Sequence, residues 1–162
     1  ANRRFIEMFG YKCTLLTDTE VITYALDFLV RKKGLTMSEA AAVIAAPFWT
    51  TIEKMPEERR AVCDYLRREF PGLLMTGPFS ILVGWNGGMM ALNDRLKLRS
   101  MVTAKNGDMT YFASEECAIR KMDENIGEIF APRGGEPVIV TLNGEQSDPP
   151  ITNLNCFAEG HI

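Results

Sequence analysis

The chain has 162 residues, of which 46% are hydrophobic and 24% are charged, as expected for one globular domain. Eighteen Lys and Arg residues against 21 Asp and Glu residues give a formal net charge of −3. The basic residues are scattered among acidic ones, so we expect no nucleic-acid or anionic-membrane partner. The longest apolar run near the middle, Phe79 to Trp85, is far too short to span a bilayer.

The first ten residues have the pattern of a helix whose beginning lies upstream of Ala1. Phe5, Ile6, Met8 and Phe9 are apolar at helical spacing, and Gly10 is a typical stop signal. Because proteins rarely begin inside a helix, we expect further residues upstream of Ala1. The start carries no charged-then-apolar leader, so we expect no signal peptide.

Helical signals follow as far as residue 70. Thr17 or Asp18 can cap a helix, whose acidic first turn suits the positive end of the helix dipole. Thr36 or Ser38 can cap a second helix, and Pro56 suits the first turn of a third. After a short extended segment at 11–16, we expect helices over 17–33, 36–46 and 56–70, with a further short segment at 49–54.

The pattern then changes from helical to alternating. Asn86-Gly87-Gly88 and Lys105-Asn106-Gly107-Asp108 are hairpin turn signals. We expect strands at 79–85, 89–92, 101–104, 109–113, 128–130 and 137–142, a short helix that Ser114-Glu115-Glu116 caps and that runs to about Met122, and a turn at 133–136. Helices followed by hairpins predict an α+β fold with an antiparallel sheet covered by helices.

The cysteines and the histidine indicate no metal or disulfide chemistry. Cys13, Cys63, Cys117 and Cys156 form no C-x-x-C pair, and we expect buried, reduced thiols in a cytoplasmic protein. His161 is the single histidine of the sequence. A metal site or a Ser-His-Asp triad within this chain is therefore not expected, and neither is a cofactor.

Single motifs carry little information by themselves. The Gly-rich segments lack the spacing of phosphate-binding loops and read as turns. The charged run Asp94 to Arg99 would by itself be a solvated connector, and Asp18 would be a helix cap.

The order of the motifs is more informative. The chain reads Gly10-Tyr11, Thr17-Asp18-Thr19-Glu20-Val21, Gly77-Pro78-Phe79-Ser80, Asn93-Asp94-Arg95, Leu98-Arg99, Phe112-Ala113-Ser114-Glu115 and Gly135-Glu136-Pro137-Val138. This order resembles the class-II glutamine amidotransferases, the N-terminal-nucleophile hydrolases found in glutamate synthase, amidophosphoribosyltransferase, glucosamine-phosphate synthase and asparagine synthetase. The resemblance covers residues 1–145 and is weakest between 34 and 72. It looks closest to stand-alone subunits related to glutamate synthase.

Three positions depart from the family pattern. Lys97 stands where the family often has Gly, and Ser100 stands where it often has Pro. Gly135-Glu136-Pro137 inverts the usual Pro-Gly-Glu order. These departures concern the subfamily and leave the expected fold unchanged.

The resemblance implies a four-layer αββα sandwich with two antiparallel sheets, incomplete at the N-terminus. Residues 1–145 would form the amidotransferase domain without its first strands, and residues 146–162 would be a linker or tail. The family hydrolyses L-glutamine to glutamate and ammonia with an N-terminal Cys, which would lie upstream of this chain. The expected partners are L-glutamine, the missing N-terminal segment, and a synthase domain or subunit that receives the ammonia.

The resemblance also assigns roles to particular residues. Asp18, with Thr19 beside it, matches the position that binds the α-ammonium group of glutamine, and we expect it to face a cleft between two stacked sheets. Asp94, Arg95 and Arg99 match a structural connector, expected as a scaffold network of ion pairs. No catalytic residue is expected in this chain, which alone should be inactive.

Two other interpretations stay open. The chain can be a non-catalytic amidotransferase-like module with a structural or regulatory role, or an unrelated α+β binding domain.

Overall fold

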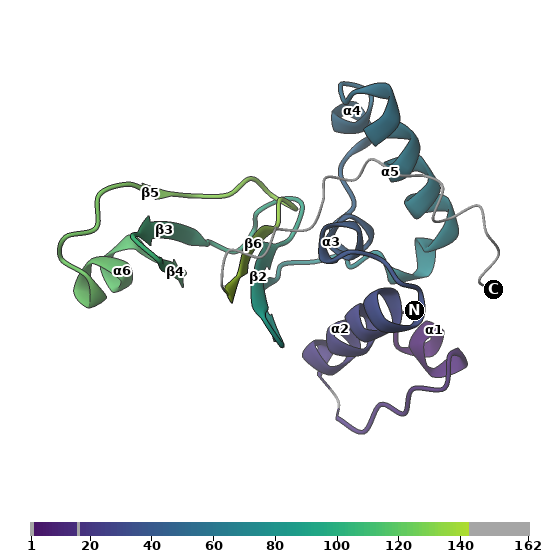
Figure 1. Ribbon diagram of the computed structural model, residues 1–162. Coiled ribbons are helices and arrows are strands. Elements are labelled where there is room, and N and C mark those ends of the chain that lie inside the picture. The colour runs from purple at the N-terminus through teal and green to yellow at the C-terminus, as the bar shows by residue number, and fades with distance from the viewer. Residues whose placement is uncertain (1, 16, 143–162) are drawn as a thin grey trace. The chain divides into compact units, whose positions relative to one another are not determined.

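The computed structural model describes residues 2–15 and 17–142 (Figure 1). The chain divides into two compact units. Among the described residues, the first unit ends at Met75 and the second begins at Thr76. The expected boundary between a domain at 1–145 and a tail at 146–162 lies outside the described residues, as do Cys156 and His161.

The first unit is helical. Its elements are α1 (Asn2–Met8), α2 (Asp18–Asp27), the π-helical turn η1 (Phe28–Lys32), α3 (Met37–Ile44), α4 (Trp49–Ile52), α5 (Glu57–Glu69) and the 3-10 turn η2 (Pro71–Leu73). The expected helices are confirmed, and the expected helix over 17–33 ends in the π-helical turn. Large apolar side chains, among them Ile6, Phe28, Leu29, Ile44 and Leu66, are fully buried, so apolar packing holds these short helices together.

The helix ends follow the local sequence. The Thr17 hydroxyl accepts a hydrogen bond from the Glu20 N–H and caps α2. Thr36 and Glu39 form a reciprocal capping box at the start of α3. Thr17 and Thr36 are therefore the caps among the candidates that the sequence offered.

A polar cluster on the first unit joins the segment after α1 to the end of α2. The Tyr11 hydroxyl donates to the Asp27 carboxylate, which also accepts two bonds of 2.7 Å from the Arg31 guanidinium. The Lys32 ammonium lies 4.2 Å from the centre of the Tyr11 ring. The bonds from Arg31, opposed by burial and aided by the Tyr11 bond, lower the pKa of Asp27 to about 2.

The second unit contains two antiparallel sheets. One has the order β1 (Ser80–Trp85), β2 (Gly88–Asn93), β6 (Val138–Thr141), and the other has the order β4 (Met109–Ala113), β3 (Val102–Asn106), β5 (Ile129–Phe130). Helix α6 (Glu116–Met122) contributes Ile119 to a small core with Ala104 and Ile126. The α+β fold class is confirmed.

One hairpin of the second unit is tighter than the sequence predicts. Strand β3 continues to Asn106, which pairs with Met109 across a two-residue turn, because Gly107 takes the positive φ of 56° that a tight hairpin needs. Helix α6 begins inside the expected Ser114-Glu115-Glu116 start. Glu115 occupies the N-cap position in extended conformation and makes no side-chain cap bond. Within the described parts of the chain, no helix is long and apolar enough to cross a membrane.

The Asp27 cluster predicts an acid-dependent loss of stability. A carboxyl in an unfolded chain has a pKa of about 3.9, whereas the pKa of Asp27 in the fold is about 2. The folded state therefore favours ionised Asp27, so its contribution is present above pH ~4 and is lost as the pH falls toward ~2. Urea unfolding of the wild type and of Asp27→Asn between pH 2 and pH 6 measures this. The gap between the two proteins should close on acidification, and a constant gap would contradict the prediction.

Candidate functional site

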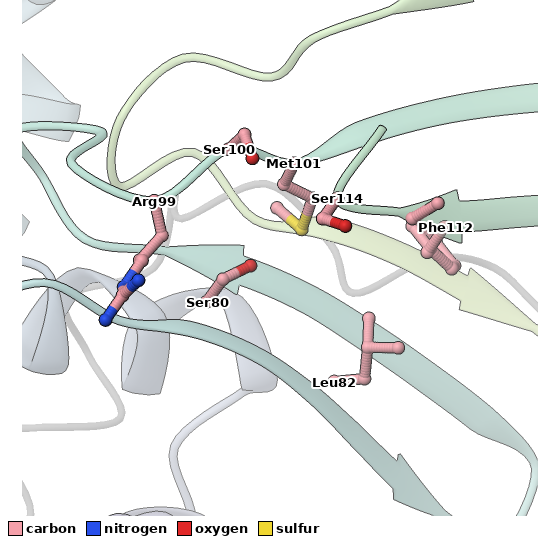
Figure 2. Close-up of a pocket in the computed structure, with 8 residues that line it drawn as sticks. Ser80, Leu82, Arg99, Ser100, Met101, Phe112 and Ser114 are labelled. Carbon is pink, nitrogen blue, oxygen red and sulfur yellow. The ribbon is translucent and has the colours of Figure 1, made fainter. Parts of the chain in front are cut away.

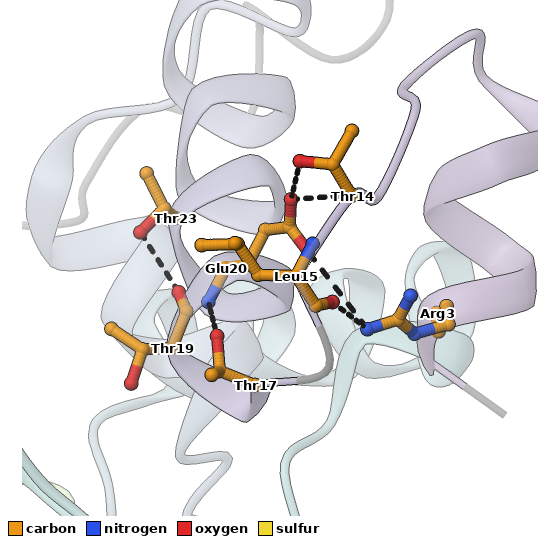
Figure 3. A network of polar contacts seen from close by, with 7 residues as sticks. All are labelled: Arg3, Thr14, Leu15, Thr17, Thr19, Glu20 and Thr23. Atoms are coloured by element: carbon orange, nitrogen blue, oxygen red, sulfur yellow. Dashed lines mark hydrogen bonds and ion pairs between the residues drawn. The ribbon is translucent and has the colours of Figure 1, made fainter.

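The Asp18-Thr19-Glu20 motif sits at the start of α2, and its glutamate holds the preceding loop (Figure 3). The Glu20 carboxylate accepts bonds from the Thr14 N–H at 2.8 Å and the Leu15 N–H at 2.9 Å. It also accepts one from the Thr14 hydroxyl, and the Arg3 guanidinium lies 3.8 Å away. The Glu20 side chain is 7% exposed, so these bonds replace the water that a carboxylate needs.

The ionisation of Glu20 follows from the same contacts. Burial alone would raise its pKa, but the hydrogen bonds from Thr14 and Leu15 and the charge of Arg3 together lower it. Glu20 is therefore a charged residue with a structural role, because its carboxylate holds the main chain of Thr14 and Leu15. Sequence reasoning grouped it with the acidic first turn and missed this role.

Asp18 and Thr19 are exposed first-turn residues of α2. The Thr19 carbonyl accepts a bond of 2.8 Å from the Thr23 hydroxyl, so the Thr19 main chain belongs to the helix (Figure 3). Both residues lie in the first unit, whereas the two sheets lie in the second. The expected cleft around Asp18 stays a prediction.

The connector after β2 is organised by one buried carboxylate. Asp94 is 2% exposed. Its carboxylate accepts hydrogen bonds from the Phe79 N–H at 3.3 Å, the Leu96 N–H at 3.0 Å, and the Leu98 N–H at 3.2 and 3.1 Å. The Asp94 N–H in turn donates to the Phe79 carbonyl. Asp94 thus ties the segment before β1 to the whole connector through main-chain bonds.

The glycine turn before β6 packs directly on the same connector. The Gly135 N–H donates to the Asn93 carbonyl at 3.2 Å. A Cβ atom at Gly134 would lie 2.5 Å from the Arg95 carbonyl oxygen, closer than any real contact allows. Three motif segments that are distant in sequence therefore meet at residues 93–95.

The contacts of Asp94 and Arg99 differ from those expected of an ion-pair network. The Asp94 bonds described above go to main-chain N–H groups, and within the described residues Arg99 forms no ion pair. The Arg99 carbonyl accepts a bond from the Asn93 side-chain amide, and the Arg99 side chain is exposed. Arg95 and Arg99 stay assigned to the connector, but Asp94 organises it through the backbone.

Lys97 adopts a backbone conformation that favours glycine. Its φ is +54°, and its N–H donates to the Asp94 carbonyl to close the turn. A left-handed conformation costs a residue with a side chain about 1 kcal/mol. The amidotransferases that the motifs resemble often have Gly at this position, and the positive φ of Lys97 is a conformation that Gly adopts without strain.

A pocket of about 360 Å³ lies in the second unit beside this connector (Figure 2). Strand β1 and the end of β4 supply walls, and the segment 99–101 supplies the rest. Figure 2 draws Arg99 at one end, and Leu82 and Phe112 toward the other. The lining residues are Ser80, Leu82, Arg99, Ser100, Met101, Phe112, Ala113 and Ser114.

Most of this lining comes from the motifs that the sequence singled out. Ser80, Arg99 and the run Phe112 to Ser114 belong to three separate motifs. Leu82 and Met101 were predicted only as strand residues, because apolar side chains carry no signal that separates a core from a pocket wall. Sequence reasoning did not assign this pocket.

The thiols of the described chain are not activated. Cys63 is buried, Cys13 is half-buried and Cys117 is exposed, so the expectation of burial is wrong for Cys117. Burial raises the pKa of the Cys13 and Cys63 thiols, and a hydrogen bond with Glu115 raises that of Cys117. A cysteine nucleophile is activated by a lowered pKa or by an adjacent base, and the pKa of each of these three thiols is raised.

Comparison with known proteins identifies a relative without assigning an activity. No known family matches the chain. The chain is 41% identical over 147 residues to a protein of Archaeoglobus fulgidus described only as an uncharacterized protein. The match takes in 91% of this chain and 39% of that relative. The chain therefore spans about two fifths of the length of the relative that it matches.

The contact between the glycine turn and the connector predicts a steric effect at Gly134. Gly134→Ala should destabilise the fold by about 1–3 kcal/mol, because the new methyl group overlaps the Arg95 carbonyl. Gly127→Ala is the matched control, since a Cβ there meets nothing within 4 Å. Chemical denaturation measures both. Equal stabilities of the two variants would show that the turn does not pack on the connector.

The conformation of Lys97 predicts a stabilising substitution. Lys97→Gly should raise the free energy of unfolding by up to about 1 kcal/mol, because glycine adopts a positive φ without strain. Lys97→Ala removes the same side chain and keeps the strain, so it should give no such gain. Thermal denaturation of the three proteins separates the outcomes, and a gain in the alanine variant would assign the effect to the lost lysine side chain.

Proposed function

We propose that this chain is the later part of a class-II glutamine amidotransferase domain, in a protein that releases ammonia from L-glutamine for a synthase partner such as glutamate synthase. The observation that supports the proposal best is the meeting of the separated motifs. The segments at 77–80 and 134–135 pack on residues 93–95, and the motifs at 80, 99 and 112–114 share one pocket. A set of motifs that meets in space is expected of one inherited fold, and chance matches would be scattered.

The fold class agrees with the proposal at the coarse level. The chain has two antiparallel sheets and several helices, and a four-layer αββα sandwich is built from the same kinds of element. The proposed complete domain adds strands upstream of Ala1, where the N-terminal Cys belongs. A cytoplasmic location is part of the same proposal.

Asp18 is the residue of this chain that we assign to substrate binding, with Thr19 beside it. Its carboxylate is exposed at the first turn of α2, and the loop before it is held by Glu20. A carboxylate presented on a fixed backbone binds an ammonium group through a charge-assisted hydrogen bond. Asp18 would thereby orient the α-amino group of glutamine and hold the side-chain amide toward the nucleophile.

The proposed chemistry needs a cysteine from outside this chain. The thiolate of an N-terminal Cys attacks the side-chain amide carbon, and its own α-amino group takes the thiol proton and passes it to the leaving nitrogen. Ammonia departs as the thioester forms, and water then releases glutamate. The raised pKa values of Cys13, Cys63 and Cys117 agree with a nucleophile located elsewhere.

The alternative is a non-catalytic module with the same fold. The main-chain bonding of Asp94 and Glu20 would be the same in such a protein, because it serves the fold. Hydrolysis of glutamine by the complete protein separates the two functions, and its absence despite correct folding would favour the module.

The test is Asp18→Asn in the complete protein. We expect the KM for glutamine to rise at least tenfold, since a charge-assisted bond is replaced by a neutral one, while the reactivity of the N-terminal Cys toward an alkylating agent stays the same. Steady-state kinetics and alkylation rates measure the two effects. Unchanged glutamine kinetics would remove Asp18 from the site. The 162-residue chain alone should release no ammonia from glutamine.

Glu20→Gln provides the control that separates binding from folding. It weakens the acceptor of the Thr14 and Leu15 N–H groups, so it should lower the melting temperature. Asp18→Asn, at an exposed position, should leave the melting temperature nearly unchanged. A similar fall in both variants would mean that Asp18 supports the helix and does not bind substrate.

A further inference from the structure

The pocket of the second unit has one charged group among its lining residues. Arg99 supplies it, and none of the other seven lining side chains is ionisable near neutral pH. Within the described residues the Arg99 guanidinium forms no ion pair. An exposed guanidinium beside a hollow has unused donors in the planar arrangement that suits a carboxylate.

The position of Arg99 is set by its backbone. The Asn93 side chain is fully buried, and its amide nitrogen donates to the Arg99 carbonyl at 3.3 Å. Asn93 lies directly opposite Ser80 in the β1–β2 pair, so both side chains leave the same face of the sheet. The hydrogen bond from Asn93 therefore fixes the backbone of Arg99 at the edge of the pocket, whereas the Arg99 side chain stays exposed.

Serine hydroxyl groups supply the remaining polar surface of the pocket. Ser80, Ser100 and Ser114 line the pocket and are exposed, and their hydroxyls make no hydrogen bond with the described residues. A hydroxyl can donate to a carboxylate oxygen or accept from a ligand. Figure 2 draws Ser80 and Ser100 on the side of Arg99, which gives the pocket a polar end.

Apolar side chains form the other end. Leu82 is 57% exposed, although it belongs to a strand, and Phe112 and Met101 lie on other parts of the wall. The volume of about 360 Å³ falls in the range of small-molecule sites. One cation at a hydroxyl-rich end and an apolar wall at the other match a monoanion with a short hydrocarbon tail.

We propose that this pocket binds a small monocarboxylate, with the carboxylate on Arg99 and the serine hydroxyls and the aliphatic tail against Leu82, Met101 and Phe112. The residues that line this pocket do not include Asp18 or Thr19, which are proposed for glutamine, and neither proposal depends on the other. Inorganic phosphate is also an anion but has no hydrocarbon tail, so contact with the apolar wall distinguishes the two classes of ligand.

The test is a titration of the isotope-labelled 162-residue chain with acetate, butanoate, hexanoate and inorganic phosphate, followed by amide NMR. We expect shifts at Ser80, Ser100 and Ser114, and an affinity that grows about fourfold per methylene group, because each methylene buries apolar area. Equal affinities for acetate and hexanoate would overturn the proposal. So would phosphate binding as tight as that of butanoate, or no shift at these serines.

Two variants test the two ends of the pocket. Arg99→Gln should weaken hexanoate binding at least tenfold, whereas Arg68→Gln, a change of another exposed arginine, should leave it unchanged. Leu82→Asn should keep acetate binding and reduce the gain per methylene. The amide spectrum reports whether each variant is folded. If Arg99→Gln does not fold, Leu82→Asn decides, and an unaltered dependence on chain length in that variant overturns the proposal.

Discussion

The second unit depends on a carboxylate that is removed from water and satisfied by the protein backbone. Asp94 is nearly fully buried, and it accepts bonds from the N–H groups of Phe79, Leu96 and Leu98. A buried charge without such partners would be strongly destabilising, so these bonds oblige the segment before β1 and the connector after β2 to keep their positions. The glycine turn before β6 packs on the same backbone. The pocket exists because these segments are held together.

The first unit uses the same chemistry on a smaller scale. The Glu20 carboxylate accepts hydrogen bonds from the N–H groups of Thr14 and Leu15 and thereby holds these two residues against the start of α2. In both units the acidic residue of a motif acts on the main chain of a loop, and the residue proposed to meet a ligand is a neighbour. Asp18 follows the loop that Glu20 holds, and Arg99 follows the turn that Asp94 holds. The resembling motifs thus combine supporting residues with residues that are free to bind.

Two positions at which the chain differs from the pattern of the amidotransferases that it resembles can be explained by their local structure. Lys97 occupies a left-handed position that glycine would occupy without strain, so the sequence difference is tolerated at a modest cost and the turn is kept. Ser100, at a position where proline is common in the family, lines the pocket and adds a hydroxyl to it. Lys97 and Ser100 thus affect the backbone strain and the polarity around the connector, whereas the Asp94 bonds hold its path.

The sequence by itself determined the local features, because capping, glycine turns and hairpin signals act over a few residues. It predicted the helices of the first unit, the hairpins of the second and the α+β class, and it placed Asp18 at a helix start. It did not predict that Asp94 binds backbone N–H groups, or that Ser80, Arg99 and Ser114 share a pocket. Those features were decided by the tertiary structure, since they depend on which main-chain groups are left without partners and on which segments meet after folding. The burial of a single polar residue and its long-range hydrogen bonds leave no periodic pattern in a sequence, so sequence reasoning assigns Asp94 to a charged surface connector.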